Sequence, residues 1–407
     1  MSDKDNLGRP MKRFILIAFV LIAALKTESY PCTIVMVSGS NTALAGSNED
    51  SVFPLTMIWY VPATGNNYGR VCFGYRMIMN SVQGGMNEKG LFVDGNSLGR
   101  QGWRADDSKQ KLAGPLLDMI LARCATVGEV KQFFNSYNTP DLDRARIPVM
   151  DSSGASMIVE WYNGEVVFLE TDQPYQVATN FVGSAYIGRE NPCWRYNRAV
   201  EFLGTKDSYS VEVVRDALDA THVEGDNSIT VYSFICDLKS GDIYVYNYMD
   251  FANPLRFNLR EELNKGAQQY FLGSLFTRRS PDYEQFIADG PVKMVERGYS
   301  SGMINGTLFY GILTANYPEA FGRKIGIDVL SRVGCNLMDG GNRNDGIIFL
   351  ERNVVAFPDS ARTHFEMANA YLKTNNKEKA IAEYNKTLEI NPDHKEALLA
   401  LDNLQNR

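Results

Sequence analysis

Two pairs of adjacent β-strand patterns, each joined by a short turn, constrain the fold of this chain most. Residues 157–162 and 165–169 flank Asn163-Gly164, a dipeptide typical of two-residue hairpin turns. Residues 231–237 and 242–247 flank a second turn at Ser240-Gly241. Amphipathic helical patterns accompany these hairpins at residues 115–124, 127–137, 196–203 and 211–220. Hairpins with interleaved helices predict a layered α+β domain with antiparallel sheets, which we place at residues 32–257.

The composition narrows the possible chemistry. With 44% hydrophobic and 22% charged residues, the 407-residue chain has the composition of a globular enzyme. A net charge of -7 argues against a dedicated nucleic-acid binder. The three histidines, His222, His364 and His394, do not have the spacing of a zinc site or a metalloprotease helix. The six cysteines contain no CxxC pair, so a zinc ribbon or thioredoxin motif is not predicted. We therefore expect an enzyme whose base is not histidine, with no metal or organic cofactor.

The N-terminus has the pattern of an export signal. A basic segment at residues 11–13 is followed by an apolar run at 14–25, which is shorter than the roughly 20 residues of a membrane span. An uncleaved membrane anchor is the alternative. Small residues at Thr27 and Ser29 place signal cleavage before Tyr30. We expect residues 1–31 to be a signal peptide and propeptide, and the mature protein to be periplasmic or secreted without a stable membrane span.

The C-terminal part contains a repeat. Pro358 and Pro392 are 34 residues apart, and each is followed by Asp. A helix-turn-helix period of 34 residues is typical of tetratricopeptide repeats. The second copy carries the apolar and small positions of that pattern, and the first has Gly334 and Gly346 at the small ones. We expect two repeats and a capping helix at residues 325–407, after a helical linker at 258–324. Peptide binding, self-association and packing on the first domain all remain open as roles for this tail.

A series of short motifs runs through the first domain in a fixed order. It consists of Cys32-Thr33, Ala-Gly-Ser-Asn-Glu-Asp at 45–50, Gly-Met-Asn-Glu-Lys-Gly-Leu-Phe-Val-Asp-Gly-Asn-Ser-Leu at 85–98, Ala-Thr-Asn-Phe at 178–181 and Cys-Trp-Arg-Tyr-Asn-Arg at 193–198. The series resembles the N-terminal-nucleophile (Ntn) amidohydrolases of the choloylglycine hydrolase, penicillin V acylase and acid ceramidase group. It is most similar to the acyl-CoA:6-aminopenicillanic acid acyltransferase subgroup of linear amide C–N hydrolases. The resemblance implies a four-layer αββα sandwich with the nucleophile at the start of an inner strand.

The resemblance also implies roles for five residues. Cys32 matches the N-terminal nucleophile, and Asp50 the aspartate that holds its free amine and thiol. Asn96 matches an oxyanion-hole residue, Asn180 a second oxyanion or scaffold donor, and Arg195 an arginine near the nucleophile that favours the thiolate. A free α-amine has a pKa of about 7.7–8.0, so the amine of Cys32 could accept the thiol proton without a histidine.

Two positions depart from the family pattern. Bile-salt and penicillin V hydrolases usually carry Arg where this chain has Ser47, which argues against a bile-salt substrate. Pro31 precedes the nucleophile, so we expect removal of Tyr30-Pro31 by self-cleavage or by a peptidase after export.

These observations predict an exported cysteine Ntn hydrolase. It would cleave a linear, non-peptide C–N amide bond of a small N-acyl substrate through a thioester acyl-enzyme. One alternative is an acyltransferase that passes the acyl group to an amine such as 6-aminopenicillanic acid. Another is a tetratricopeptide interaction protein whose catalytic domain is inactive.

Overall fold

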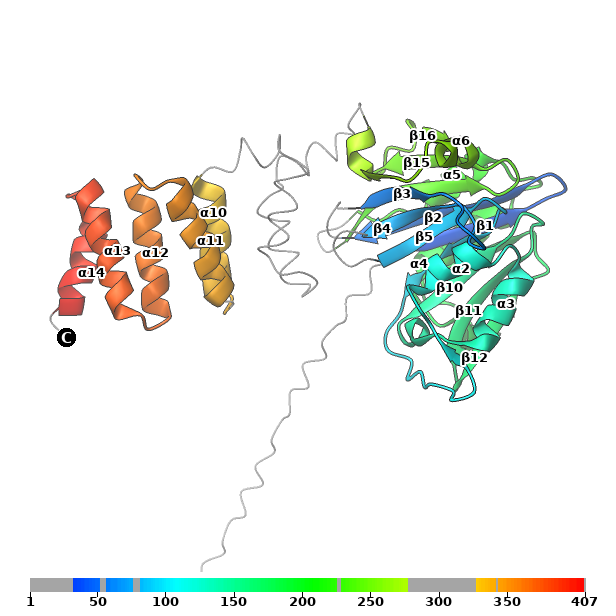
Figure 1. The fold of residues 1–407 in the computed structure, drawn as a ribbon, viewed down its shortest axis with the longest axis horizontal. Helices are drawn as coiled ribbons and strands as arrows, with labels where there is room; N and C mark the ends of the chain where they lie inside the picture. The colour runs from blue at the N-terminus through cyan, green and yellow to red at the C-terminus, as the bar shows by residue number, and fades with distance from the viewer. Residues whose placement is uncertain are drawn as a thin grey trace, which may run out of the picture.

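A computed structural model describes residues 32–51, 56–75, 81–224, 228–276, 327–341 and 343–405. It contains a domain of sheets and helices up to residue 276 and a helical tail from residue 327 (Figure 1). The predicted signal segment, the Tyr30-Pro31 dipeptide and most of the predicted linker lie outside the described residues.

The first sheet is antiparallel and has six strands. In spatial order these are β13 (Tyr175–Ala178), β1 (Thr33–Ser38), β2 (Ala43–Ser51), β14 (Ile229–Asp237), β15 (Asp242–Asn247) and β16 (Leu255–Asn258). β1 and β2 form a hairpin in which Thr33 pairs with Asn48 and Ser38 with Ala43. β2 lies between β1 and β14, and all nine of its residues are buried.

The second sheet has nine strands. Its main path is β12 (Glu165–Glu170), β11 (Ser156–Tyr162), β10 (Ala145–Met150), β6 (Phe92–Asp94), β5 (Ser81–Asn87), β4 (Arg70–Tyr75), β3 (Met57–Val61) and β17 (Gln268–Phe271). The short strand β7 (Asn96–Ser97) pairs with β10, and β8 (Gln110–Lys111) pairs separately with β9 (Tyr137–Asn138). The hairpin of β11 and β12 turns at Asn163 and Gly164, whose φ angles of 51° and 91° are those of the predicted turn.

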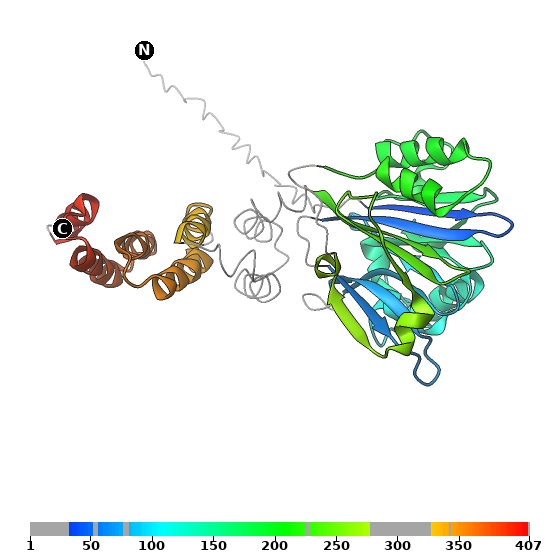
Figure 2. The same cartoon turned by 90° about the horizontal axis from the view of Figure 1, so that it is seen from above.

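The two sheets face each other across one hydrophobic core. Phe73 of β4 stacks on Phe234 of β14 with ring centroids 4.1 Å apart, which joins the sheets. Two helices cover the outer face of the nine-stranded sheet, α2 (Leu116–Arg123) and α3 (Val127–Ser136). Two others, α4 (Trp194–Gly204) and α5 (Val211–Asp219), cover the outer face of the six-stranded sheet. In Figure 2, α4 and α5 lie on one side of the strands, and α2 and α3 lie on the other. The predicted αββα order of layers and the four predicted helices are therefore confirmed.

The domain continues beyond Phe257, the predicted boundary. The helix α6 (Leu259–Asn264) follows β16, and β17 then pairs with β3 at the edge of the nine-stranded sheet. A 3-10 helix, η3 (Leu272–Leu275), buries Leu272 in the core between the sheets. The sheet and its core therefore include residues nearly 20 positions beyond the predicted boundary, because a long-range strand pair at 268–271 carries too little local pattern to be recognised.

The tail consists of successive helices. They are α10 (Ile327–Asp339), α11 (Arg343–Ala356), α12 (Ala361–Lys373), α13 (Lys377–Ile390) and α14 (Lys395–Gln405). Gly334 and Gly346 lie where α10 meets α11, and a Cβ on Gly346 would come within 2.9 Å of the carbonyl oxygen of Gly334. These are the small positions of the predicted first repeat. In the described part of the chain, every helix is too short or too polar to cross a bilayer.

Candidate active site

Cys32 occupies the position just before β1, at the end of the core between the sheets. The pairing of Thr33 with Asn48 places Cys32 opposite Glu49 on the adjacent strand. The Sγ atom of Cys32 lies 3.6 Å from Oε2 of Glu49, and its backbone nitrogen donates to Oδ1 of Asn180 at 2.7 Å. Cys32 is only 5% exposed, so its thiol is held in a defined environment.

The carbonyl oxygen of Cys32 is held from two further elements. Arg195, on α4, donates from Nη1 to this oxygen at 2.7 Å and from Nη2 to Oδ1 of Asn180 at 3.2 Å. Asn96, on β7, donates from Nδ2 to the same oxygen at 3.3 Å. Asn180 follows β13 and uses its own Nδ2 to donate to the carbonyl oxygen of Ser97 at 2.9 Å. Three of the predicted site residues, up to 163 positions away in the chain, thus meet around Cys32.

Asp50, the fifth predicted residue, reaches the site in a different way. Its backbone N–H hydrogen-bonds the sulfur of Cys32 and lowers the pKa of the thiol. Its side chain accepts a 2.5 Å hydrogen bond from the hydroxyl of Thr230 on β14. The second carboxylate oxygen, Oδ2, has no hydrogen-bond partner among the described residues. Burial raises the pKa of this carboxyl, and the nearby charge of Arg195 opposes that effect.

Two further carboxyls, to which the sequence motifs assign no role, lie near the thiol. Glu49 accepts a hydrogen bond from the hydroxyl of Ser47 at 2.7 Å, and burial raises its pKa to about 7. Asp94, on β6, is fully buried, and its pKa is raised by burial and by the charge of Glu49. Burial raises the pKa of the Cys32 thiol well above its ordinary value, and the negative charges of Glu49 and Asp50 add to this effect. The thiol therefore carries its proton at neutral pH and needs a base in contact to become a nucleophile.

A buried ion pair supports the segment that carries Asn180. Nε of Arg146 on β10 lies 3.2 Å from Oε2 of Glu160 on β11, and both side chains are at most 2% exposed. The carboxylate of Glu160 also accepts from the backbone N–H groups of Gly183 and Ser184, at 2.9 and 2.7 Å. Arg146 in turn donates to the carbonyl oxygen of Phe181 at 2.9 Å. The sequence does carry a signal for this pair, because a charge at position 160 interrupts an otherwise apolar strand.

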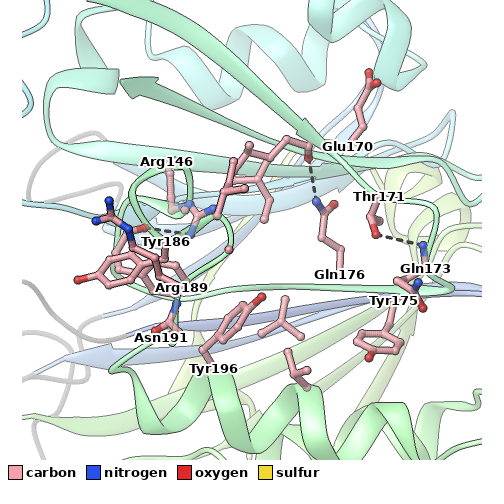
Figure 3. Close-up of a pocket in the computed structure, with 18 residues that line it drawn as sticks. Arg146, Glu170, Thr171, Gln173, Tyr175, Gln176, Tyr186, Arg189, Asn191 and Tyr196 are labelled. Carbon is pink, nitrogen blue, oxygen red and sulfur yellow. Dashed lines mark hydrogen bonds between the residues drawn. The ribbon is translucent and has the colours of Figure 1, made fainter. Parts of the chain in front are cut away.

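A cavity of about 490 Å³ lies beside this segment (Figure 3). Phe181 and Tyr196, which follow Asn180 and Arg195 in the chain, are among the residues that line it, whereas Cys32 itself is not. Phe181 forms edge-to-face contacts with Tyr186 and Tyr196, with ring centroids 5.6 and 5.1 Å apart. Figure 3 shows Arg146, Tyr186 and Arg189 together at one end of the cavity. Its walls therefore combine aromatic and aliphatic side chains with polar ones such as Gln176 and Asn191, and guanidinium groups lie at one end.

The tail and the domain each have similarities to known proteins. Residues 361–394 match the family described as tetratricopeptide repeat, at the position of the predicted second repeat. No curated protein matches the sequence. Among solved structures, penicillin V acylase from Agrobacterium tumefaciens is 20% identical with a TM-score of 0.44, covering 56% of this chain and 84% of that chain.

A variant of conjugated bile acid hydrolase from Clostridium perfringens is 16% identical with a TM-score of 0.47, covering 59% of this chain and 96% of that chain. MamA is 20% identical with a TM-score of 0.23, covering 30% of this chain and 64% of that chain. The first two proteins belong with the group that the sequence motifs resemble.

Proposed function

We propose that this protein is a cysteine Ntn amidohydrolase that cleaves a linear, non-peptide C–N amide bond. The observation that supports the proposal is that the nitrogen, the carbonyl oxygen and the sulfur of Cys32 each contact a polar side chain from another element. Asn180 binds its nitrogen, Arg195 and Asn96 bind its carbonyl oxygen, and Glu49 contacts its sulfur. A buried cysteine that served only for packing would not need such an arrangement.

The reaction begins once Cys32 is the first residue of the mature chain. Its free amine then lies beside Oδ1 of Asn180 and can accept the proton of the thiol. The sulfur attacks the carbonyl carbon of the substrate amide, and the amine leaves after receiving a proton. Water then hydrolyses the thioester and restores the thiol. Amide N–H groups of Asn96 and Asn180 would stabilise the oxyanion of each tetrahedral intermediate.

The substrate we propose is a small N-acyl amide. The cavity beside Phe181 and Tyr196 offers aromatic and aliphatic side chains to an acyl chain or an aromatic group, and Arg189 places a positive charge at one end for a carboxylate. Ser47 contacts Glu49 rather than supplying the arginine of bile-salt hydrolases. We also propose that the protein acts after export, because residues 1–31 have the pattern of a signal peptide followed by a propeptide.

The test combines N-terminal sequencing with a panel of N-acyl substrates. We expect mature, active protein to begin at Cys32 and to release free amine from at least one substrate class. Cys32→Ala and Cys32→Ser should abolish this release while leaving the fold intact by circular dichroism. Active protein with any other first residue, or full activity in Cys32→Ala, would overturn the proposal. Adding an amine acceptor to the same assay separates hydrolysis from acyl transfer by the product that forms.

For the tail we propose a role in protein interaction. Each of the described helices α10 to α14 packs against the next one along the chain, and residues 361–394 match a repeat that stacks in arrays. Leu398 and Leu399 on the terminal helix are 49% and 64% exposed, which leaves apolar side chains at its surface. Sedimentation of the full chain over a range of concentrations tests self-association. A constant monomeric mass would restrict the role to other partners.

A further inference from the structure

Glu49 is the side chain that the strand register places against the sulfur of Cys32. β1 and β2 pair so that Thr33 faces Asn48, and the next pair along the hairpin is Cys32 with Glu49. Ser47 lies two residues away on the same face of β2 and donates to Oε1 of Glu49 at 2.7 Å. This hydrogen bond fixes the carboxyl group while Oε2 lies 3.6 Å from Sγ. The sequence motifs assign no role to Glu49.

The charges around Glu49 determine where the thiol proton can go. Besides burial, the charges of Asp50 on β2 and Asp94 on β6 raise the pKa of the Cys32 thiol. Burial and the charge of Glu49 raise the pKa values of Asp94 and of Tyr232 on β14. Burial also raises the pKa of Asp50, and the charge of Arg195 on α4 opposes that effect. A thiolate that persisted among these carboxyls would be destabilised by like charge and by burial. The proton must therefore pass to a base in contact as the sulfur forms its new bond. Glu49 is in contact, and burial places its pKa at about 7, where it can both take and return a proton.

We propose that Glu49 is a catalytic residue that accepts the proton of the Cys32 thiol and later returns it, an inference that rests on the function proposed above. In acylation, the Sγ proton moves to the carboxylate of Glu49 as sulfur bonds to the amide carbon. The protonated Glu49 then gives that proton to the nitrogen, and the C–N bond breaks. In deacylation, Glu49 takes a proton from water as the oxygen attacks the thioester carbon. The C–S bond then breaks, and the sulfur recovers the proton.

Glu49 is then a second proton acceptor near the thiol, in addition to the α-amine of the mature chain. The backbone nitrogen of Cys32 faces Asn180, whereas Glu49 approaches the sulfur from the adjacent strand. Before Pro31 is removed, that nitrogen belongs to a peptide bond and cannot act as a base. The carboxylate of Glu49 does not depend on processing, so the thiol has a proton acceptor in the uncleaved chain as well.

Alkylation of Cys32 tests the inference without a known substrate. Purified full-length protein is treated with iodoacetamide, a neutral thiol reagent, at pH values from about 5 to 9, and the rate at Cys32 is followed by peptide mass spectrometry. We expect the wild-type rate to increase as pH rises through about 7, where Glu49 loses its proton. In Glu49→Gln, we expect a rate at pH 8 that is lower by about tenfold or more, since general bases typically contribute about 100-fold or more to rates.

The opposite outcome is predicted if Glu49 acts only through its charge. Removing a negative charge beside Cys32 would lower the pKa of the thiol and accelerate alkylation. A Glu49→Gln rate that is less than about threefold slower than wild type, unchanged or faster therefore overturns the inference. Glu49→Asp keeps the carboxylate and should retain more of the rate than Glu49→Gln. Cys335 in the tail is the reference thiol, and its rate should not change in any variant.

A second variant keeps the inference testable if Glu49→Gln fails to fold. The hydrogen bond from Ser47 lowers the pKa of Glu49, so Ser47→Ala should move the alkylation profile to higher pH. An unshifted profile in folded Ser47→Ala would contradict a role for Glu49. The N-acyl substrate panel is scored separately. Absent amide cleavage with normal Glu49-dependent alkylation would refute the proposed function but not the acid–base pair.

Discussion

The buried ion pair of Arg146 and Glu160 provides a quantitative test of how the segment after Asn180 is held. Both side chains are at most 2% exposed, and no solvent is available to compensate either charge if its partner is removed. Losing one partner of a buried pair typically costs about 3–5 kcal/mol. Glu160→Gln keeps an amide oxygen for one of the backbone N–H groups of Gly183 and Ser184 but leaves Arg146 unpaired. We therefore expect a cost near the lower end of that range, about 3 kcal/mol.

A double-mutant cycle separates the charge from the other contacts. Adding Arg146→Met to Glu160→Gln removes the uncompensated charge, so the double variant should be more stable than Glu160→Gln alone by about 1–2 kcal/mol. Urea unfolding followed by tryptophan fluorescence is suitable, because all four tryptophans lie in the first domain and none in the tail. A double variant that is less stable than the single one by the full cost of Arg146→Met would refute the reasoning. The two sites would then contribute independently rather than as an ion pair.

Three further predictions concern the site and its surroundings. Asn96→Ala should reduce the rate of amide cleavage by about 100-fold to 1,000-fold with little effect on the unfolding midpoint, because it removes one oxyanion donor; an unchanged turnover number would exclude Asn96 from the oxyanion hole. Gly84→Ala should lower the free energy of unfolding by about 1–3 kcal/mol, because an added Cβ would overlap Oδ2 of Asp94; a variant as stable as wild type in urea would contradict the close approach. The pKa of Glu49 rises from 4.5 in the unfolded chain to about 7 in the fold, so the folded state binds more protons between these values. The free energy of unfolding should therefore fall as pH rises from about 4.5 to about 7, with a contribution on the order of 3 kcal/mol from this group, and Glu49→Gln should flatten the fall measured in urea.

Much of the fold could be predicted from local sequence. The turn at Asn163-Gly164 and the period of the four helices depend on residues that are close in the chain, and these elements appear where the patterns placed them. The predicted site residues also meet, since Asn96, Asn180 and Arg195 all contact Cys32. The extension of the domain beyond Phe257 was missed because β17 pairs with a strand about 200 residues earlier.

The missed site residues have a common physical cause. The register of the β1–β2 hairpin decides which residue lies opposite Cys32. A shift of the register by one position would turn the side chain of Glu49 to the other face of the sheet. Asp94 and Glu160 become site residues only through the packing of two sheets, which local patterns do not encode. A carboxylate in a strand that is otherwise apolar still indicates a site residue or an ion pair, because burying a charge without a partner is strongly unfavourable.

The position of β2 between β1 and β14 has a consequence for the order of events during synthesis. The hairpin that carries Cys32 and Glu49 is made first, but Thr230, the partner of Asp50, follows 180 residues later. Until β14 is added, one edge of β2 and its buried polar residues lack their partners, and pairings over such sequence separations form slowly. The surroundings that set the reactivity of the thiol are therefore completed late. A nascent chain that ends before residue 229 holds its cysteine in an unfinished environment, which delays the chemistry of the site until the domain can fold as a unit.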